Sequence, residues 1–124
     1  REVRVAAIAC GRRHTVLLAE GGGVLVTGCN AQGQLGLGTT RGTSTFTYSP
    51  AFSRADVASI HCGGDVTLAL CSDGKVLGCG YNEDGMLGVG ECTNVHSPVE
   101  VFGGAHVSAV ACGYYHVFLA VESE

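Results

Sequence analysis

The sequence predicts an all-β protein built from tandem copies of one small sheet. Three observations lead to this prediction: a pattern returns about every 52 residues, 20 of the 124 residues are glycine, and short apolar runs are separated by hairpin signals. Apolar residues make up 46% of the chain, so a segment of this length has enough of them to form a packed core.

Two patterns define the repeat. The pattern Val-x-x-Ile/Val-x-Cys-Gly occurs three times and ends at Gly11, Gly63 and Gly113, so its copies are 52 and 50 residues apart. The pattern Gly-x-Asn-x-x-Gly-x-Leu-Gly-x-Gly begins at Gly28 and again 52 residues later at Gly80. Internal repeats of this length indicate a repeat architecture. The predicted units are residues 5–56, 57–106 and 107–124.

Short apolar runs bounded by glycine predict the strands of each unit. Asp73-Gly74, between two such runs, is a strong signal for a two-residue hairpin, and Gly21-Gly22 takes the same place one repeat earlier. The predicted strands are residues 5–10, 14–19, 24–28, 57–62, 66–71, 75–80, 107–112 and 116–121.

A helix over residues 3–20 is the alternative for the first segment, because Ala-Ala-Ile-Ala and Leu-Leu-Ala-Glu favour helices. Gly11 would lie at its centre, and a central glycine costs a helix about 1 kcal/mol relative to alanine. The copy of this segment also carries Gly63-Gly64. Strands are therefore favoured.

A Ser-Pro pair also occurs twice, but with a different spacing. Ser49-Pro50 and Ser97-Pro98 are 48 residues apart. The shorter spacing predicts that the stretch between Gly38 and Pro50 is a longer, variable loop of the first unit.

A glycine-rich β unit of about 50 residues in tandem predicts the blades of a β-propeller. Such a blade has two apolar faces and needs a neighbour on each. Its glycines then serve turns and close approaches between backbones. The Gly-x-x-Gly-x-Gly strings at residues 33–38 and 85–90 could also cradle a phosphate, but no helix follows and no lysine or acidic partner is placed for one. We expect no cofactor.

With the motifs in Ile8–Leu18 and Gly28–Gly38, the chain resembles the regulator of chromosome condensation repeat family, whose marks are G-x-x-H-[ST] and W-G-x-N-x-x-G-Q-L-G-x-G. The resemblance covers nearly all of the chain, as about two and a half repeats. Kelch repeats have a similar period but need an in-register Gly-Gly and a Trp. The resemblance implies that the chain is part of a seven-bladed propeller.

The copies depart from the family pattern at several positions. Thr27 and Cys79 stand where the family has Trp, Met86 stands in the second copy where the first has Gln34, and Val66 replaces the histidine of the second copy. These blades are expected to fold nonetheless, because volume and pattern matter more than identity in a core.

Seven cysteines suggest a disulfide scaffold or a zinc site at first. Their number is odd, no pair has C-x-x-C spacing, and several lie inside apolar runs. We expect small, reduced, unmetallated thiols in an intracellular protein, cytoplasmic or nuclear.

Charge and hydropathy exclude several classes of partner. Seven basic and eleven acidic residues give a formal net charge of −4, which argues against nucleic acid and anionic membranes. No apolar run approaches the roughly 18 residues of a membrane-spanning helix.

Catalytic residues are not expected. His14 and His116 occupy a repeated scaffold position, which favours a core or inter-blade hydrogen bond over general-base catalysis. No Gly-x-Ser-x-Gly elbow or paired carboxylate is recognisable.

The candidate binding residues are those that differ between copies while their flanks repeat. They occupy the two positions between the glycine and the histidine of each copy, where arginine and tyrosine are typical interface anchors. Because blades repeat one path, these loops should share a face and form a partner-binding surface, with residues 39–49 as the next candidate. The residues are Arg12, Arg13, Asp65, Tyr114 and Tyr115.

Three functions follow as hypotheses. The first is a non-enzymatic protein-interaction propeller. The second, implied by the resemblance, is guanine-nucleotide exchange on a Ran-like small GTPase. In the family an acidic residue directly after the glycine of the G-x-x-H motif takes part in exchange; here Arg12, Gly64 and Tyr114 stand at that position. The third is the propeller part of a HERC-type ubiquitin ligase. Open blade edges also predict self-association.

Overall fold

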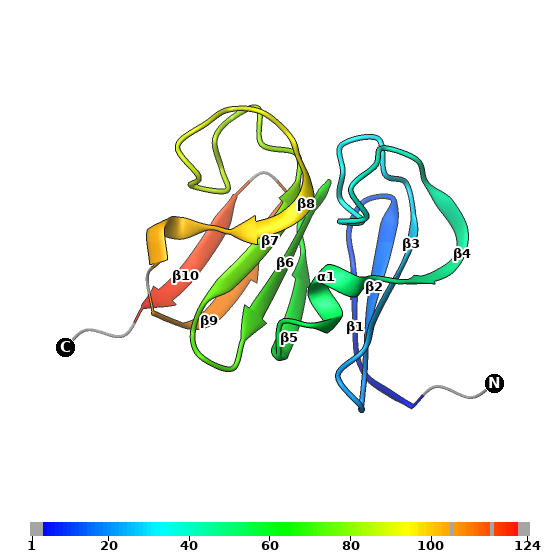
Figure 1. Ribbon diagram of the computed structural model, residues 1–124. Helices are drawn as coiled ribbons and strands as arrows, with labels where there is room; N and C mark the ends of the chain where they lie inside the picture. The colour runs from blue at the N-terminus through cyan, green and yellow to red at the C-terminus, as the bar shows by residue number, and fades with distance from the viewer. Residues whose placement is uncertain (1–3, 105, 115, 122–124) are drawn as a thin grey trace.

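The computed structural model describes residues 4–104, 106–114 and 116–121, and within these residues it has ten strands in three antiparallel sheets (Figure 1). The all-β prediction is confirmed. None of the helices in the described part is long and apolar enough to cross a membrane. The elements are β1 (Val5–Cys10), β2 (His14–Ala19), β3 (Val24–Gly28), β4 (Thr43–Tyr48), α1 (Pro50–Ser53), β5 (Val57–Cys62), β6 (Val66–Cys71), β7 (Val76–Gly80), β8 (Val95–Glu100), the 3-10 helix η1 (Phe102–Gly104), β9 (Val107–Cys112) and β10 (Val117–Val121).

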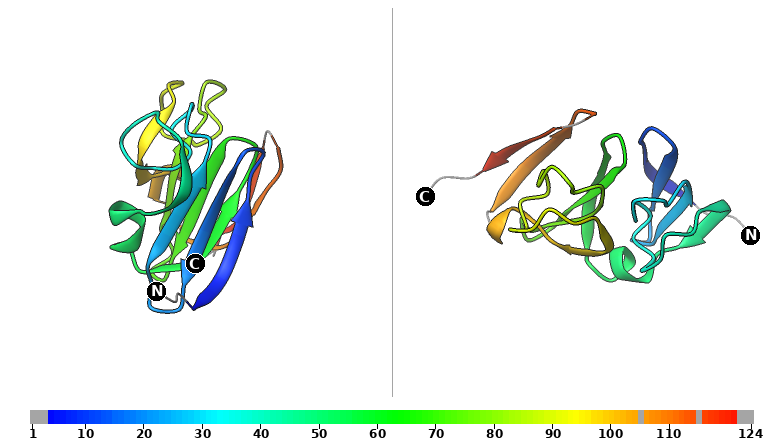
Figure 2. Two further views of the ribbon diagram at one scale, coloured as in Figure 1. Left: turned by 90° about the vertical axis from the view of Figure 1, so that its right-hand side faces the viewer. Right: turned by 90° about the horizontal axis from the view of Figure 1, so that it is seen from above.

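Each sheet follows chain order, so that every strand pairs with the next one along the sequence. Blade 1 has the order β1-β2-β3-β4, blade 2 has β5-β6-β7-β8, and β9 and β10 form the part of blade 3 that the structure describes. Seen from above, the three sheets are arranged like a fan (Figure 2). The innermost strands β1, β5 and β9 are neighbours. This is the arrangement of adjacent propeller blades.

Every predicted strand is present, with β7 and β10 each starting one residue later than predicted. The outermost strands β4 and β8 were not predicted. Their sequences are polar and β8 contains Pro98, which is tolerated because an outermost strand has one unpaired edge. Both pair with the preceding strand through the same irregular register, Gly28 with Thr43 and Gly80 with Val95.

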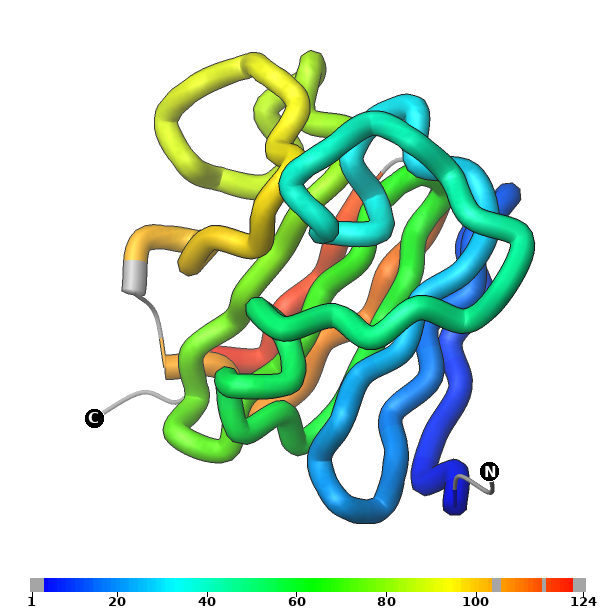
Figure 3. Tube along the Cα trace, turned by 45° about the vertical axis from the view of Figure 1, so that its right-hand side comes forward, coloured from blue at the N-terminus to red at the C-terminus, as the bar shows by residue number. Residues whose placement is uncertain are grey.

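The longer loop predicted between Gly38 and Pro50 is therefore wrong, because β3 and β4 are separated by as many residues as β7 and β8. The two Ser-Pro pairs have different structural roles. Ser49 is the N-cap of α1, where its side chain accepts a hydrogen bond from Phe52 N at 3.4 Å, whereas Ser97-Pro98 lies inside β8. The copies differ in length in the connections to the next blade, residues 49–56 and 101–106 (Figure 3).

The repeated asparagine explains how the long loops before β4 and β8 keep one shape. Asn30 Nδ2 donates to the carbonyl oxygens of Thr39 and Arg41, both at 2.9 Å, and Asn30 Oδ1 accepts from Leu35 N at 2.9 Å. Asn82 makes the corresponding three bonds in blade 2. A buried amide with all these partners ties the two ends of the loop together.

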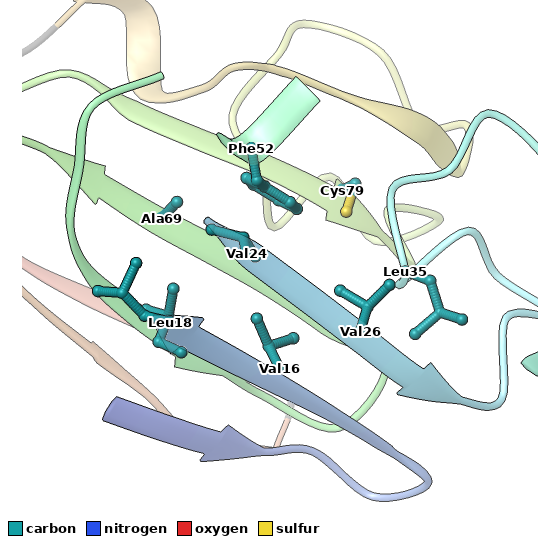
Figure 4. Close-up of a cluster of buried hydrophobic side chains, with 9 residues drawn as sticks. Val16, Leu18, Val24, Val26, Leu35, Phe52, Ala69 and Cys79 are labelled. Atoms are coloured by element: carbon teal, nitrogen blue, oxygen red, sulfur yellow. The ribbon is translucent and has the colours of Figure 1, made fainter. Parts of the chain in front are cut away.

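The cores lie between blades rather than within them (Figure 4). In the first core, side chains of blade 1 and Phe52 of α1 pack against blade 2, and Val16, Val24 and Val26 are fully buried. Ile60 of blade 2 is 7% exposed in this core, whereas the corresponding Ile8 of blade 1 is 58% exposed. A blade face is thus buried only where a neighbouring blade covers it.

Glycines allow the inner strands to approach each other closely. A Cβ atom on Gly63 would lie 2.8 Å from the carbonyl oxygen of Gly113, and one on Gly64 would lie 2.9 Å from that of Tyr114. Between the blades, Arg12 N donates to Gly64 O at 2.8 Å and Gly64 N donates to Tyr114 O at 3.2 Å. The close approach expected of some glycines is confirmed at the hub, the meeting point of the inner strands.

We predict that Gly63→Ala lowers the free energy of unfolding by about 1–3 kcal/mol, because the new methyl group meets a backbone oxygen that cannot move aside alone. The matched control is Gly21→Ala, where a Cβ meets nothing within 4 Å. Urea unfolding of both variants measures the difference. Equal stability of the two variants would contradict the role of the hub glycine.

His14 forms an inter-blade hydrogen bond, as predicted for this scaffold position, whereas His116, the other histidine of the prediction, is exposed and lies edge-on to Phe118. Its Nε2 lies 2.9 Å from Thr67 Oγ1 in blade 2, and the Thr67 hydroxyl donates to Gln34 O at 2.6 Å. Because the hydroxyl proton is used toward Gln34, the His14 Nε2–H is the donor to Thr67. Burial lowers the pKa of His14, while the nearby Asp65 opposes this shift.

This shift makes stability depend on pH. The unfolded His14 takes up a proton near its ordinary pKa of about 6.5, whereas the folded one does so only at lower pH. Stability from this group is therefore present above about pH 6.5 and is lost as the pH falls below it. Urea unfolding at pH 7.5 and 5.5 measures how much the free energy of unfolding falls between the two pH values, and this fall should be smaller in His14→Gln than in wild type. Thr67→Val should be less stable than wild type at both pH values but show the same fall, because His14 stays buried in that variant. A fall in His14→Gln as large as in wild type would exclude His14 as its source.

Candidate functional site

The loops that join β1 to β2, β5 to β6 and β9 to β10 all emerge on one face of the blade array, together with the long loops after β3 and β7 (Figures 1 and 2). We call it the hub face. It follows from the antiparallel path: the first and third connections of a blade lie at one end, and the second lies at the other. Residues far apart in the sequence therefore meet here.

An ion pair links blade 1 to blade 2 on the hub face. Arg12 Nη2 donates to Asp65 Oδ2 at 2.6 Å, and the two side chains are 41% and 12% exposed. The other oxygen, Asp65 Oδ1, accepts from Gln34 Nε2 at 3.3 Å. Both contacts come from blade 1, so Asp65 acts as a bridge between blades, and its charge is balanced by Arg12.

Tyr114 brings blade 3 into the same cluster. The Arg12 guanidinium lies over the Tyr114 ring, 5.7 Å from its centroid, within the range of a cation–π interaction. The ring reaches across blade 2 because position 64 is a glycine: a Cβ there would lie 3.3 Å from the Tyr114 ring. Arg12, Asp65 and Tyr114, from three blades, thus form one contiguous group.

A cavity of about 220 Å³ opens beside this group. Sequence reasoning missed four of its lining residues, because they come from loops and a strand end that were treated as scaffold. Two of them carried a signal, since Met86 departs from Gln34 and Val66 departs from His14 at repeated positions. The cavity is lined by Arg12, Gln32, Asp65, Val66, Tyr81, Met86 and Tyr114.

The five predicted binding residues differ in their outcome. Arg12, Asp65 and Tyr114 come together as described, whereas Arg13 is exposed beside Arg12 and does not line the cavity. Tyr115 lies outside the described residues. Asp65 is mostly buried in its inter-blade contacts, so Arg12 and Tyr114 present most of the exposed surface of the group, with Tyr114 44% exposed.

Two of the nearby thiols, Cys62 and Cys112, are poor nucleophiles. Cys62 and Cys112 line a second hub cavity of about 270 Å³ together with Cys10. Burial raises the pKa of Cys62 to about 12 and that of Cys112 to about 11, so both remain protonated at neutral pH. Among residues 4–104, 106–114 and 116–121, no group of three histidine, cysteine or carboxylate side chains could hold a metal ion.

Three relatives are similar to most of this chain. It is 39% identical over 106 residues to the X-linked retinitis pigmentosa GTPase regulator of Mus musculus, covering 85% of this chain and 11% of that protein. It is 35% identical over 121 residues to the ultraviolet-B receptor UVR8 of Arabidopsis thaliana, covering 96% of this chain and 28% of that protein. It is 39% identical over 79 residues to the secretion-regulating guanine nucleotide exchange factor of Mus musculus, covering 64% of this chain and 17% of that protein. The chain thus spans less than a third of the length of each of these relatives.

Solved structures share the arrangement of the blades. Human WBSCR16 superposes with a TM-score of 0.84 and 31% sequence identity over 96% of this chain and 31% of its own. Prp20p from Saccharomyces cerevisiae superposes with a TM-score of 0.82 and 18% identity over 99% of this chain and 32% of its own, which shows a common fold.

Two family models match the sequence. Both describe the regulator of chromosome condensation (RCC1) repeat; one matches residues 21–70 and 73–120, and the other residues 5–34 and 57–85. The matched segments cover most of the chain and both complete blades. This chain therefore belongs to the RCC1 repeat family.

Proposed function

We propose that this chain is a non-enzymatic protein-interaction module of an RCC1-type propeller, with the hub face as its partner-binding surface. One observation carries the proposal: Arg12 of blade 1 and Tyr114 of blade 3 meet over blade 2 and both stay exposed. The Arg12 side chain is 41% exposed, and Tyr114 as a whole residue is 44% exposed. Arginine and tyrosine are the residue types that most often dominate binding energy.

The contacts within the group favour binding further. Arg12 is held by Asp65 and by the Tyr114 ring, so its long side chain has already lost much of its rotamer freedom before a partner arrives. Ordering such a side chain costs about 0.5–1.5 kcal/mol on association. A group that is ordered in the free protein avoids this cost and presents a fixed shape to the partner.

The proposal predicts which substitutions abolish binding. In the full protein, Arg12→Ala combined with Tyr114→Ala should lower the affinity for a partner that binds the hub face by more than tenfold, or about 2 kcal/mol. Proximity labelling with wild type identifies the bound proteins, and calorimetry with each purified protein measures its affinity for wild type and variant.

The matched control is Arg54→Ala combined with Lys75→Ala. These exposed basic residues lie at the opposite end of the blades, before β5 and in the β6–β7 hairpin. This control should bind every partner as wild type does. Equal affinity of the Arg12/Tyr114 variant for all partners would refute the hub face as the binding surface.

Guanine-nucleotide exchange is the second candidate, supported by the identity to the secretion-regulating exchange factor and by the fold shared with Prp20p, whose binding properties to Gsp1p and histones have been studied. The residues of these blades argue against it. No acidic residue directly follows the hub glycines at positions 11, 63 and 113, and Asp65, one position later, is paired with Arg12.

We therefore expect that Asp65 does not accelerate the release of fluorescent GDP from a Ran-like GTPase. In that assay, Asp65→Asn and wild type should give the same rate. A rate increase by wild type that Asp65→Asn abolishes would assign exchange to these blades and replace the interaction proposal.

A further inference from the structure

The two junctions between blades differ at one repeated position on the hub face. At the first junction Gln34 is fully buried; its Nε2 donates to Asp65 at 3.3 Å, and its Oε1 accepts from Gln32 N at 2.9 Å. At the second junction the same position is Met86, which is half-buried. A thioether cannot make the two hydrogen bonds of the Gln34 side-chain amide, so the second junction lacks them.

The cavity of about 220 Å³ lies beside Met86 and is lined by residues of all three blades. Val66 and Met86 give it aliphatic walls, the rings of Tyr81 and Tyr114 add aromatic surface, and Gln32 is an uncharged polar part of the lining. Its two charged residues, Arg12 and Asp65, are paired with each other at 2.6 Å, so the cavity presents little net charge. The Tyr81 hydroxyl donates to Asp84 Oδ2 at 3.1 Å, which fixes one wall.

We propose that this cavity receives one uncharged apolar side chain, such as leucine or phenylalanine, from an extended segment of the protein partner. The inference rests on the proposed function of the hub face and names what the partner inserts. Its size is suitable, because apolar cavities of about 150 Å³ bind benzene. A charged side chain is disfavoured, because it would be desolvated where the neighbouring charges are already paired.

The loop that carries Tyr81 predicts one residue that flanks this anchor. Glu83 and Asp84 are exposed on this long loop of blade 2, close in sequence to the lining residue Tyr81. A basic residue beside the apolar anchor would complement these two carboxylates. Complementary charge of this kind sets the orientation of the segment.

Methionine suits a wall that must adapt to an inserted side chain, because it is flexible and polarizable. Met86 is also the single methionine of this sequence, so it offers a specific probe. Labelling methionine methyl groups with carbon-13 in the full protein, with Met86→Leu to assign the signal, places a reporter in the cavity wall.

The test uses four blocked amino acids as probes: the N-acetyl, N-methylamide forms of leucine, phenylalanine, aspartate and lysine. The leucine and phenylalanine probes should shift the Met86 methyl signal saturably at millimolar concentration, and the charged probes at least tenfold more weakly. A charged probe that binds as well as leucine, or no saturable shift with either apolar probe, would overturn the inference.

Variants separate the cavity from general folding effects. Saturation-transfer NMR should show at least tenfold weaker leucine-probe binding to Met86→Gln, which installs the residue of the first junction, and near wild-type binding to Met86→Leu. Val99→Gln, the same kind of change at a 40% exposed site on β8, is the control. Should Met86→Gln fail to fold, Tyr81→Ala provides the same comparison. Undiminished leucine binding to the folded cavity variants contradicts the inference.

The same variants distinguish this inference from the proposed function. Partner binding that depends on Arg12 and Tyr114 but tolerates Met86→Gln would refute the apolar anchor and retain the hub face. Probe binding at Met86, with partner affinity that is indifferent to Arg12 and Tyr114, would refute the hub face as the partner surface. Loss of partner binding in both sets of variants supports both.

Discussion

The close contact of the inner strands at the hub is the constraint on which the rest of the structure depends. Glycine at positions 11 and 63 lets the inner strands of consecutive blades come close enough to bond backbone to backbone, as in the 2.8 Å bond from Arg12 N to Gly64 O. A blade has two apolar faces, and only a neighbour at the right distance can cover them. The hub contact sets that distance, so the cores between blades, and the polar bonds around them, form only when it is made.

One repeated scaffold therefore gives two different junctions. At the first, Gln34, Thr67 and His14 form a chain of buried hydrogen bonds that closes the space between blades. At the second, Met86 replaces the glutamine and a cavity lies beside it. The strand order is the same in both complete blades, so the difference between the two junctions lies in their side chains. The Arg12–Asp65 pair is partly exposed, and its main effect is to hold side chains in place rather than to add stability.

The repeat, the inner three strands of blades 1 and 2, the two strands of blade 3, the hairpins and the family could all be predicted from the sequence. These features depend on local patterns: short apolar runs bounded by glycine, Asp73-Gly74 at a turn, and glycine where no side chain fits. His14 could be placed in an inter-blade bond because it recurs at a scaffold position. The outer strands β4 and β8 could not be predicted, because strands at a blade edge have polar sequences and one contains proline.

The sequence by itself determined that three hub loops share a face and which residues vary there. Only the tertiary structure decided what those residues do to one another. Asp65 turned out to bridge blades rather than face solvent, and Arg13 to lie apart from the group that its neighbour Arg12 joins. The physical reason is distance along the chain: Arg12, Asp65 and Tyr114 come from three repeats, and their contacts depend on how far and at what angle one blade is set against the next. No local pattern encodes that geometry, because the packing of whole blades creates it.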